Sequence, residues 1–299
     1  MYDEGNMHPL ARKINTFLMT KGELPDSVMD WAAKVYREKL ETYNEKRRPY
    51  KDHVSMSSVG KPFCQLHAEK LKWPKLPVSD SLKLKMLYGH TTEVIALAVL
   101  YASGVNILTM SEKTVLPTEN GDIKGELDLI IEIDGQPSLW DIKTASPYAY
   151  DSKFSSYEKL KDNDDFGYVD QLHGYTRAAR KDYPGLVIGG WIVVHKVTGE
   201  IKIVPANPMD EPEIISKISN TLKRYSEATE DNFERSYNDV QETFYKKPTG
   251  NRKLGITCSY CDFKYSCWPG LEHKPNERSR SKDAFAYYTH WRPMDGGQS

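Results

Sequence analysis

Residues 125–143 read GELDLIIEIDGQPSLWDIK, and this stretch decides the fold. Two short apolar runs flank an Asp-Gly pair at 134–135, a pattern that predicts two antiparallel strands joined by a tight turn. A hairpin that turns there returns Asp128, early in the first strand, to the side of Asp141, near the end of the second. The stretch therefore predicts two carboxylates close together in one sheet.

The second strand adds a lysine beside these acids. Side chains alternate along a strand, so Asp141 and Lys143 are expected on one face and Ile142 on the other. Two neighbouring acids repel each other unless a cation joins them, and Mg²⁺ or Mn²⁺ suits a site made of carboxylates, water and phosphate. The alternative is a solvent-facing hairpin with ordinary surface charges, and the triplet from Asp141 to Lys143 alone does not exclude it.

The composition limits the class of protein. A chain of 299 residues has room for one large domain or for one domain with appendages, and its 39% apolar content is low but sufficient for a core. The net charge of −1 means that any nucleic-acid binding must come from local basic patches. No apolar run is long enough for a membrane helix, and the N-terminal residues do not form a signal peptide. We expect a soluble protein of the bacterial or infected-host cytoplasm, without membrane contacts.

Taken in order, the chain predicts helices, a strand-rich centre, one helix, two strands and further helices, which together give an α/β fold with one mixed central sheet. A long charged helix is expected over most of 209–245, and a basic Gly/Pro loop at 246–253. The polar tail from about residue 274 is expected to be irregular.

A polar pair interrupts the apolar half of the helix expected at 80–103. His90 and Glu93 are three residues apart, so they occupy adjoining positions on one helical face. An unpaired buried carboxylate is costly, so Glu93 needs a partner such as a metal ion or a lysine. The alternative is that Glu93 lies at the helix boundary and reaches water.

Four short motifs follow one another in a fixed order. They are G-x-x-x-E ending at Glu93, G-E-x-D ending at Asp128, D-x-K from Asp141 to Lys143, and Q-x-x-x-Y from Gln171 to Tyr175. This series, over roughly residues 55–205, resembles the PD-(D/E)XK nuclease superfamily, specifically its RecB-like exonuclease branch. In that branch the same motifs occur in the same order on helix, strand, strand and helix.

One position departs from the RecB-like pattern. Many RecB-like members have a histidine where Glu93 stands, whereas here a histidine is present at His90. Glutamate occurs at this position in other branches, such as phage-type exonucleases. We therefore expect Glu93 to be the functional residue and His90 to be accessory.

The resemblance implies a role for each residue of the series. Asp128, Asp141 and the backbone carbonyl of Ile142 would hold Mg²⁺ or Mn²⁺, and Glu93 would complete the shell directly or through water. Lys143 would orient or deprotonate the attacking water, or stabilise the charge on phosphate. Gln171 and Tyr175 would position the DNA backbone and the lysine.

The resemblance also implies an architecture. It is a restriction-endonuclease-like core with a mixed central sheet flanked by helices, preceded by N-terminal helices and followed by a cysteine cluster. The expected regions are an N-terminal helical region at 1–54, the nuclease core at 55–206, a helical region with the cysteine motif at 207–273 and a polar tail at 274–299.

The cysteines form a second pattern. One stands alone early in the chain and three form C-x2-C-x5-C near its end: Cys64, Cys258, Cys261 and Cys267. Four thiolates satisfy either a 4Fe–4S cluster or tetrahedral zinc, and spacing favours neither; buried, unligated cysteines are the alternative. Together with SSVGKPFC at 57–64, the pattern resembles iron–sulfur nucleases such as the AddB subunit and the CRISPR-associated RecB-like nucleases. That resemblance favours a 4Fe–4S cluster that ties the two ends of the chain together.

These patterns lead to one functional expectation. The protein is expected to be a metal-dependent DNA exonuclease that acts on single strands or DNA ends, in recombination, repair or phage DNA metabolism. Aromatic and basic residues at 148–161 suit stacking on bases and following the backbone, although a solvated loop explains them equally well. The alternatives are an endonuclease or flap nuclease of the same fold, and a non-catalytic nucleic-acid-binding module. The chain has no phosphate-binding loop of an ATP-driven motor.

Overall fold

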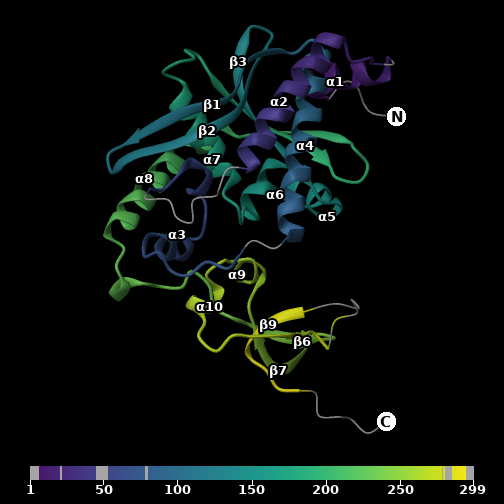
Figure 1. Cartoon of the computed structure of the whole chain (residues 1–299). Coiled ribbons are helices and arrows are strands. Elements are labelled where there is room, and N and C mark those ends of the chain that lie inside the picture. Colours follow the sequence, from purple (N-terminus) through teal and green to yellow (C-terminus); the bar gives the residue numbers. More distant parts are fainter. Residues whose placement is uncertain are drawn as a thin grey trace, which may run out of the picture. The chain divides into compact units, whose positions relative to one another are not determined.

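Two units with separate β-sheets make up the computed structural model (Figure 1). The structure describes residues 7–20, 22–44, 53–77, 80–277, 279 and 285–293. The first unit consists of the described parts of Met1–Arg48, His53–Lys61 and Val78–Arg224. The second unit consists of the described parts of Pro62–Pro77 and Tyr225–Ser299.

A mixed sheet forms the centre of the first unit and confirms the expected fold class. In the described part of this unit the strand order is β1-β2-β3-β4-β5, and only β3 and β4 are parallel. The strands are β1 (Asn106–Thr118), β2 (Gly121–Ile133), β3 (Gln136–Ala145), β4 (Val187–His195) and β5 (Ile201–Pro205).

The hairpin predicted at 134–135 joins β2 to β3. Ile133 pairs with Gln136, and Asp134 and Gly135 have φ values of 52° and 80°. Both values lie in the left-handed region that this type of two-residue turn requires. The register continues to Leu129 opposite Trp140, so the next residues along the two strands are Asp128 and Asp141.

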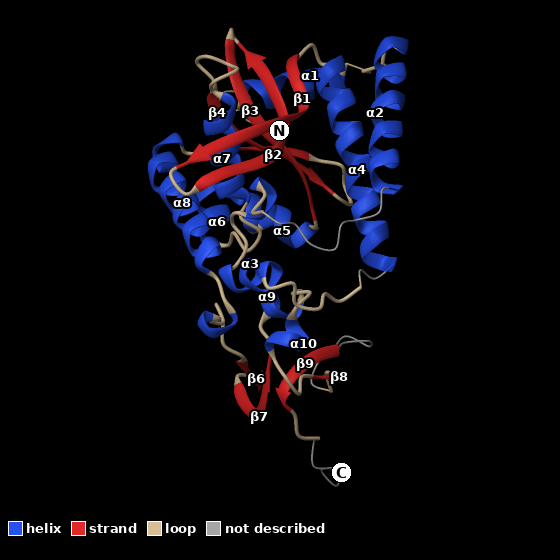
Figure 2. Ribbon diagram, turned by 60° about the vertical axis from the view of Figure 1, so that its left-hand side comes forward, coloured by secondary structure: helices blue, strands red, loops and turns tan. Residues whose placement is uncertain are grey.

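Helices cover both faces of this sheet (Figure 2). One side carries α1 (Pro9–Met19), α2 (Asp26–Asn44) and α4 (Asp80–Ala102). The other side carries α7 (Tyr168–Ala179) and α8 (Glu211–Glu227). The connection from β3 to α7 contains the short helices α5 (Pro147–Asp151) and α6 (Tyr157–Asp162), and 3-10 turns lie at Met56–Ser58, Lys153–Ser155 and Pro208–Asp210.

The main apolar core lies between α1, α4 and the sheet. Alternating residues of the strands supply one side of it, and the apolar half of α4 supplies the other, because burying these side chains is the main favourable term in folding. The buried members are Leu10, Ile14, Ala96, Leu97, Leu100, Val105, Leu129, Ile131, Trp140, Ile142, Ile192 and Val194. Ile142 therefore packs into the core from the middle of the D-x-K motif, while its two neighbours face away from it.

Glycines permit two close contacts on the α7 side of the sheet. The backbones of Gly60 and Gly167 approach so closely that a Cβ atom at Gly60 would lie 2.1 Å from the Cα atom of Gly167. A Cβ atom at Gly125 would lie 2.6 Å from both Met56 and the ring of Tyr175. These contacts fix the turn at 55–60 and the sequence G-E-x-D against α7.

The second unit contains a sheet that the sequence did not indicate. Within its described residues the strand order is β6-β7-β9-β8 and every pair is antiparallel. Its elements are α3 (Phe63–Lys70), a 3-10 turn at Glu230–Asn232, β6 (Val240–Phe244), β7 (Lys247–Lys253), α9 (Ile256–Ser259), α10 (Lys264–Cys267), β8 (Glu272–Pro275) and β9 (Phe285–His290). The buried Glu242 accepts hydrogen bonds from Thr249, Asn251 and Tyr288, which satisfies its carboxylate inside this sheet.

Three local expectations are wrong. The long helix expected at 209–245 ends at Glu227, and β6 occupies the end of that range. The basic loop expected at 246–253 is almost entirely the strand β7, and the tail expected to be irregular contains the second half of β8 and all of β9. These strands are short, and β7 pairs with β9 across more than thirty residues, so local pattern carries little of their signal. The division into regions at 54, 206 and 273 stays a prediction.

No helix in the described part of the chain is long and apolar enough to cross a membrane.

Candidate active site

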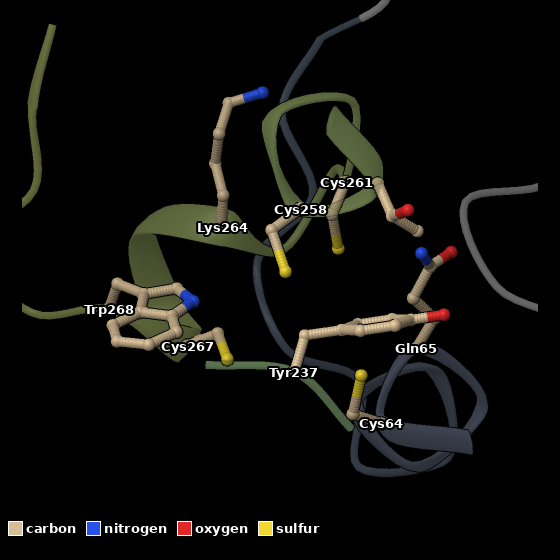
Figure 3. A pocket seen from close by; sticks show the side chains of 9 residues that line it. Cys64, Gln65, Tyr237, Cys258, Cys261, Lys264, Cys267 and Trp268 are labelled. Carbon is tan, nitrogen blue, oxygen red and sulfur yellow. The ribbon is translucent and has the colours of Figure 1, made fainter. Parts of the chain in front are cut away.

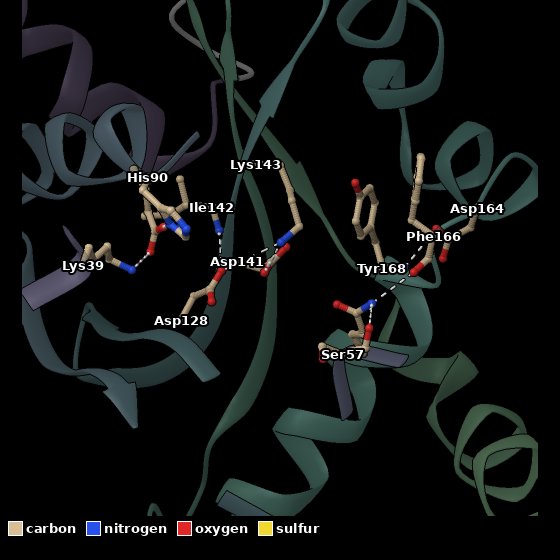
Figure 4. A network of polar contacts seen from close by, with 12 residues as sticks. Lys39, Ser57, His90, Asp128, Asp141, Ile142, Lys143, Asp164, Phe166 and Tyr168 are labelled. Carbon is tan, nitrogen blue, oxygen red and sulfur yellow. Dashed lines mark hydrogen bonds and ion pairs between the residues drawn. The ribbon is translucent and has the colours of Figure 1, made fainter. Parts of the chain in front are cut away.

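Asp128, Asp141 and Lys143 meet where β2 and β3 run side by side (Figure 4). The ammonium of Lys143 lies 2.6 Å from Asp141 Oδ1 and 3.9 Å from Asp128 Oδ2. The backbone amide of Ile142 donates a hydrogen bond of 3.4 Å to Asp128 Oδ2. The hairpin register thus brings both acids and the lysine into one polar cluster, as the sequence predicted.

The two acids have opposite pKa shifts. Burial raises the pKa of Asp128, but the charge of Lys143 and hydrogen bonds from Asp141 and the Ile142 amide outweigh it, so this pKa is lowered. Burial also raises the pKa of Asp141, and the negative charge of Asp128 adds to it despite Lys143, so this pKa lies well above the ordinary value. The pair therefore retains a proton more readily than two separate carboxyl groups.

Lys143 is held as an ammonium ion. Burial lowers its pKa, but the two neighbouring acids raise it by a larger amount, so the net shift is upward. Its ammonium also lies 5.2 Å from the centre of the Tyr168 ring, within the range of a cation–π contact. Tyr168 begins α7, and the sequence interpretation missed it. Its place three residues before Gln171, on the same helical face, was the available signal.

Glu93 forms an ion pair with a lysine from another helix. Lys39 of α2 lies 2.6 Å from Glu93 Oε1, and His90 Nδ1 lies 3.8 Å from Glu93 Oε2. Sequence reasoning required a metal ion or a lysine as the partner of Glu93, and the structure supplies the lysine. Lys39 itself was missed, because α2 packs on α4 only in the tertiary structure. Its positive charge also acts on Asp128, which places the ion pair beside the acid cluster.

Gln171 and Tyr175 reach the site from α7 in different ways. Gln171 Nε2 donates to the carbonyl of Phe166 at 3.0 Å and to that of Ser57 at 3.4 Å, so this side chain ties the backbone around α7 together. Tyr175 is buried against Gly125. Burial raises the pKa of Tyr175, and the charges of Asp128 and Asp141 raise it further, so its hydroxyl lies within the field of both acids.

No group of three or more His, Cys, Asp or Glu side chains is arranged to hold a metal ion among the residues that the structure describes. Asp128 and Asp141 nevertheless fit a divalent cation by their chemistry. They are two neighbouring oxygen donors whose repulsion raises the pKa of Asp141, and a hard cation removes that repulsion. Glu93, an expected third ligand, pairs with Lys39 instead of joining them.

The second unit brings the four cysteines to one cavity (Figure 3). The backbone of Cys64, in α3, donates to Ser236 Oγ at 3.2 Å, and Lys70 donates to the carbonyls of Tyr225 and Ser226 at 2.8 Å. These bonds attach α3 to the last turn of α8 and to the segment that follows it. Cys258 of α9, Cys267 of α10 and Cys261 between the two helices line the same cavity, although they are almost two hundred residues away from Cys64 in the sequence.

The thiols of this cavity suit a metal or a cluster in number and type. All four cysteines are free. Burial raises the pKa of Cys258 and of Cys261 to about 11, and the neighbouring cysteines add to both shifts. Four thiols at one cavity match the number and type of donors that zinc or a 4Fe–4S cluster takes, and such a bound group would deprotonate them.

The mixed sheet and the Asp-Asp-Lys cluster define a class, the proteins with a restriction-endonuclease-like fold. The family model described as the PD-(D/E)XK nuclease superfamily matches residues 27–268. The chain therefore belongs to the PD-(D/E)XK nuclease superfamily, whose members typically use Mg²⁺ or Mn²⁺. No curated protein matches the chain.

Solved structures give weaker likenesses. SSO0001 is 15% identical over 79% of this chain and 94% of its own, with a TM-score of 0.41. A "Putative exonuclease" from Eubacterium rectale is 14% identical over 78% of this chain and 88% of its own, with a TM-score of 0.35. Protein VC1899 from Vibrio cholerae is 10% identical over 73% of this chain and 58% of its own, with a TM-score of 0.20. At these scores the likenesses add nothing about activity.

Proposed function

We propose that this nuclease is a metal-dependent DNA exonuclease that hydrolyses phosphodiester bonds on single strands or at DNA ends. The observation that carries the proposal is the contact of Asp128 and Asp141 with the ammonium of Lys143. Asp128 ends the G-E-x-D motif, and Asp141 and Lys143 form the D-x-K motif, by which the sequence resembles the family. The residues matched by the family model, 27–268, include all three.

The chemistry of hydrolysis gives each of these residues a task. A Mg²⁺ or Mn²⁺ ion held by Asp128 and Asp141, with Glu93 and the Ile142 carbonyl as further candidate ligands, would polarise the phosphate and make a bound water more acidic. Lys143, held as an ammonium ion, would donate hydrogen bonds to the attacking water or to a phosphate oxygen. The contact with Tyr168 limits the conformations that the lysine can adopt.

Residues of α7 hold the geometry around this cluster. Gln171 fixes the backbone at Ser57 and Phe166, next to the start of the helix. Tyr175 fills the space beside Gly125, at the start of the G-E-x-D motif. We propose that these two residues position the substrate backbone and Lys143 by keeping β2, β3 and α7 in register. His90, 3.8 Å from Glu93, would be accessory to that carboxylate.

The cysteine cavity supports a second part of the proposal, a structural 4Fe–4S cluster held by Cys64, Cys258, Cys261 and Cys267. Four thiols from two distant segments line one cavity, which is the donor set that such a cluster requires. Joining segments almost two hundred residues apart would restrict the unfolded chain and add the free energy of binding to folding. Zinc satisfies the same donor set, so the metal content of the purified protein distinguishes the two.

Cleavage assays on the purified chain test the proposed activity. Linear single-stranded DNA labelled at one end and circular single-stranded DNA are each incubated with Mg²⁺, with Mn²⁺ and with EDTA. An exonuclease degrades the linear DNA in the presence of metal and leaves the circle intact. Cleavage of the circle would establish an endonuclease or flap nuclease instead. DNA binding with no cleavage under any metal would establish a non-catalytic binding module. Either result would refute the exonuclease.

A further inference from the structure

An aromatic and basic cluster lies next to Lys143, between β3 and α7. Its members are Lys153, Phe154, Phe166 and Tyr168. The rings of Phe154 and Tyr168 are stacked with centroids 6.1 Å apart, and those of Phe166 and Tyr168 are stacked at 5.6 Å. Phe154 is buried beneath this stack, whereas Phe166 is 57% exposed. The cluster therefore presents the exposed ring of Phe166 to solvent above the packed rings of Tyr168 and Phe154.

Hydrogen bonds and a glycine contact hold the backbone that carries the cluster. Asp164 accepts hydrogen bonds of 2.9 Å and 2.8 Å from the amides of Tyr168 and Val169, so its carboxylate caps the start of α7. Gly167 has a φ of 72° and lies against Gly60, which holds the turn before α7 in one place. The Phe166 carbonyl is also held by Gln171. The ring of Phe166 is thus displayed by a fixed segment of backbone.

The ammonium of Lys153 lies beneath this aromatic surface and donates no hydrogen bond to the described residues. Its ammonium lies 4.9 Å from the centre of the Phe166 ring and 5.0 Å from that of Tyr168. Asp164 Oδ1 is 4.0 Å away, and no group in the described part of the chain accepts a hydrogen bond from this buried nitrogen. A buried ammonium without such a partner is costly, so rotation of this long side chain towards solvent, to pair with an incoming anion, would be favourable.

The ring of Tyr168 lies next to both Lys153 of the cluster and Lys143 of the candidate active site. Lys143 and Lys153 each lie about 5 Å from the centre of Tyr168, so their ammonium groups are within about 10 Å of each other. Neighbouring phosphates of one strand are also several ångströms apart, so two successive phosphates can contact the two lysines together. A base next to the second phosphate would then lie near the exposed ring of Phe166.

We propose that Lys153, Phe166 and Tyr168 form a subsite for the nucleotide next to the scissile phosphodiester, and that this subsite selects single-stranded nucleic acid. Phe166 stacks on the base and Lys153 pairs with the phosphate. A base is free to stack on a protein ring only when it is unpaired, so the subsite discriminates against duplexes. The inference rests on the proposed nuclease function and names its substrate class.

Binding measurements in EDTA test the subsite without cleavage. The probe is a fluorescently labelled oligothymidylate, compared with a labelled duplex, and binding is followed by anisotropy at several salt concentrations. Phe166→Leu should weaken binding of the single strand about 5- to 150-fold and leave binding of the duplex within about twofold. Lys153→Met should reduce the slope of log affinity against log salt by about 0.7, the value of one phosphate contact on a single strand.

Lys13→Met provides the control, because Lys13 is exposed on α1, which lies on the other side of the sheet from α7 (Figure 2). It removes the same charge and should leave both affinities within about twofold of wild type. If Phe166→Leu and Lys153→Met bind the single strand like this control, the subsite is wrong. Cleavage of linear single strands by the wild type in Mn²⁺ would then show that the proposed function survives. A wild type that neither binds nor cleaves single strands would overturn both.

Discussion

Glu93 is the proposed metal ligand that forms an ion pair with a lysine in the structure. In the structure its carboxylate is paired with Lys39 at 2.6 Å, and the charge of Lys39 also acts on Asp128. A lysine in this position competes with a divalent cation for the same negative charge. The proposed role of Glu93 as a metal ligand therefore requires that this ion pair open, or that a water molecule bridge Glu93 and the cation.

We predict that Lys39→Met increases the affinity for Mn²⁺ by about three- to tenfold, because about 1 kcal/mol of a partly exposed ion pair no longer competes with the cation. Isothermal titration calorimetry without DNA measures this change. Lys34→Met, at an exposed position of the same helix, is the control and should bind Mn²⁺ like the wild type. Weaker Mn²⁺ binding by Lys39→Met would show that the lysine supports the metal site instead of competing with it.

His173 makes folding sensitive to acid. It is fully buried on α7, and neither ring nitrogen has a hydrogen-bond partner among the described residues. Burial lowers the pKa of His173 to about 4 despite the nearby acids Glu211 and Asp210. The unfolded chain takes up a proton near pH 6.5, whereas the folded chain does so only near pH 4. The folded state therefore loses stability as the pH falls from 6.5 towards 4.

Substituting His173 by leucine should remove this pH dependence. The loss in the wild type amounts to about 3 kcal/mol across the interval, since each pKa unit corresponds to about 1.4 kcal/mol. Melting temperatures of both proteins at pH 7 and pH 4 measure it, and the other titrating groups contribute equally to both. Parallel pH profiles for His173→Leu and wild type would mean that His173 is not buried in its neutral form.

At the scale of elements, the turn at 55–60 and the start of α7 depend on a backbone contact between two glycines. Gly60→Ala places a methyl group 2.1 Å from Gly167, so we expect a loss of about 2 kcal/mol or more in the free energy of unfolding. Gly89→Ala on α4 meets nothing within 4 Å and should stabilise the helix by about 0.5–1 kcal/mol. Chemical denaturation of the two variants gives both values. Equal stabilities would show that the close approach of Gly60 and Gly167 is absent in solution.

The elements that could be predicted from the sequence are those with strong local signals. The hairpin has an Asp-Gly turn between alternating apolar residues, and α4 has an apolar run after Glu93, from residue 94 to 102. The hairpin's own register then places Asp128 beside Asp141, which is why the acid pair could be predicted without any other part of the fold. The mixed sheet and its flanking helices are confirmed.

Other features depend on contacts that no local pattern carries. The second sheet pairs the short strands β7 and β9, which are far apart in sequence, and the sequence interpretation expected irregular structure at both. Lys39 reaches the site from α2, and only the packing of α2 on α4 shows it, whereas the position of Tyr168 on the face of Gln171 was a weak sequence signal. The catalytic and metal-binding roles of the predicted residues stay predictions, because geometry alone does not test them.

At the scale of the whole molecule, the chain combines the nuclease core with a second unit that contains the cysteine cavity. In the sequence, all strands of the first sheet lie between α3 and the rest of this unit. The fold nevertheless brings Cys64 of α3 to the same cavity as the cysteines of the C-x2-C-x5-C motif. A cluster at this point would stabilise a unit whose own core is small.

We predict that Cys258→Ser lowers the free energy of unfolding by about 2–5 kcal/mol, comparable to the loss of a covalent cross-link, and abolishes the visible absorbance of anaerobically purified protein. Metal analysis and thermal melting measure both effects. Tyr260→Ser, at an 80% exposed position between two of the cysteines, is the control and should keep its metal. Unchanged melting of Cys258→Ser, with neither iron nor zinc in the wild type, would refute a metal centre in the second unit.

The central claim is that Asp128, Asp141 and Lys143 form the catalytic centre of a nuclease. The most direct measurement is the rate at which end-labelled linear single-stranded DNA is degraded in Mn²⁺ by wild type, Lys143→Met and the control Lys13→Met. We expect degradation by wild type and by the control, and a rate at least about a hundredfold lower for Lys143→Met with unchanged melting. A Lys143→Met protein that degrades the DNA within about twofold of the wild-type rate would contradict it.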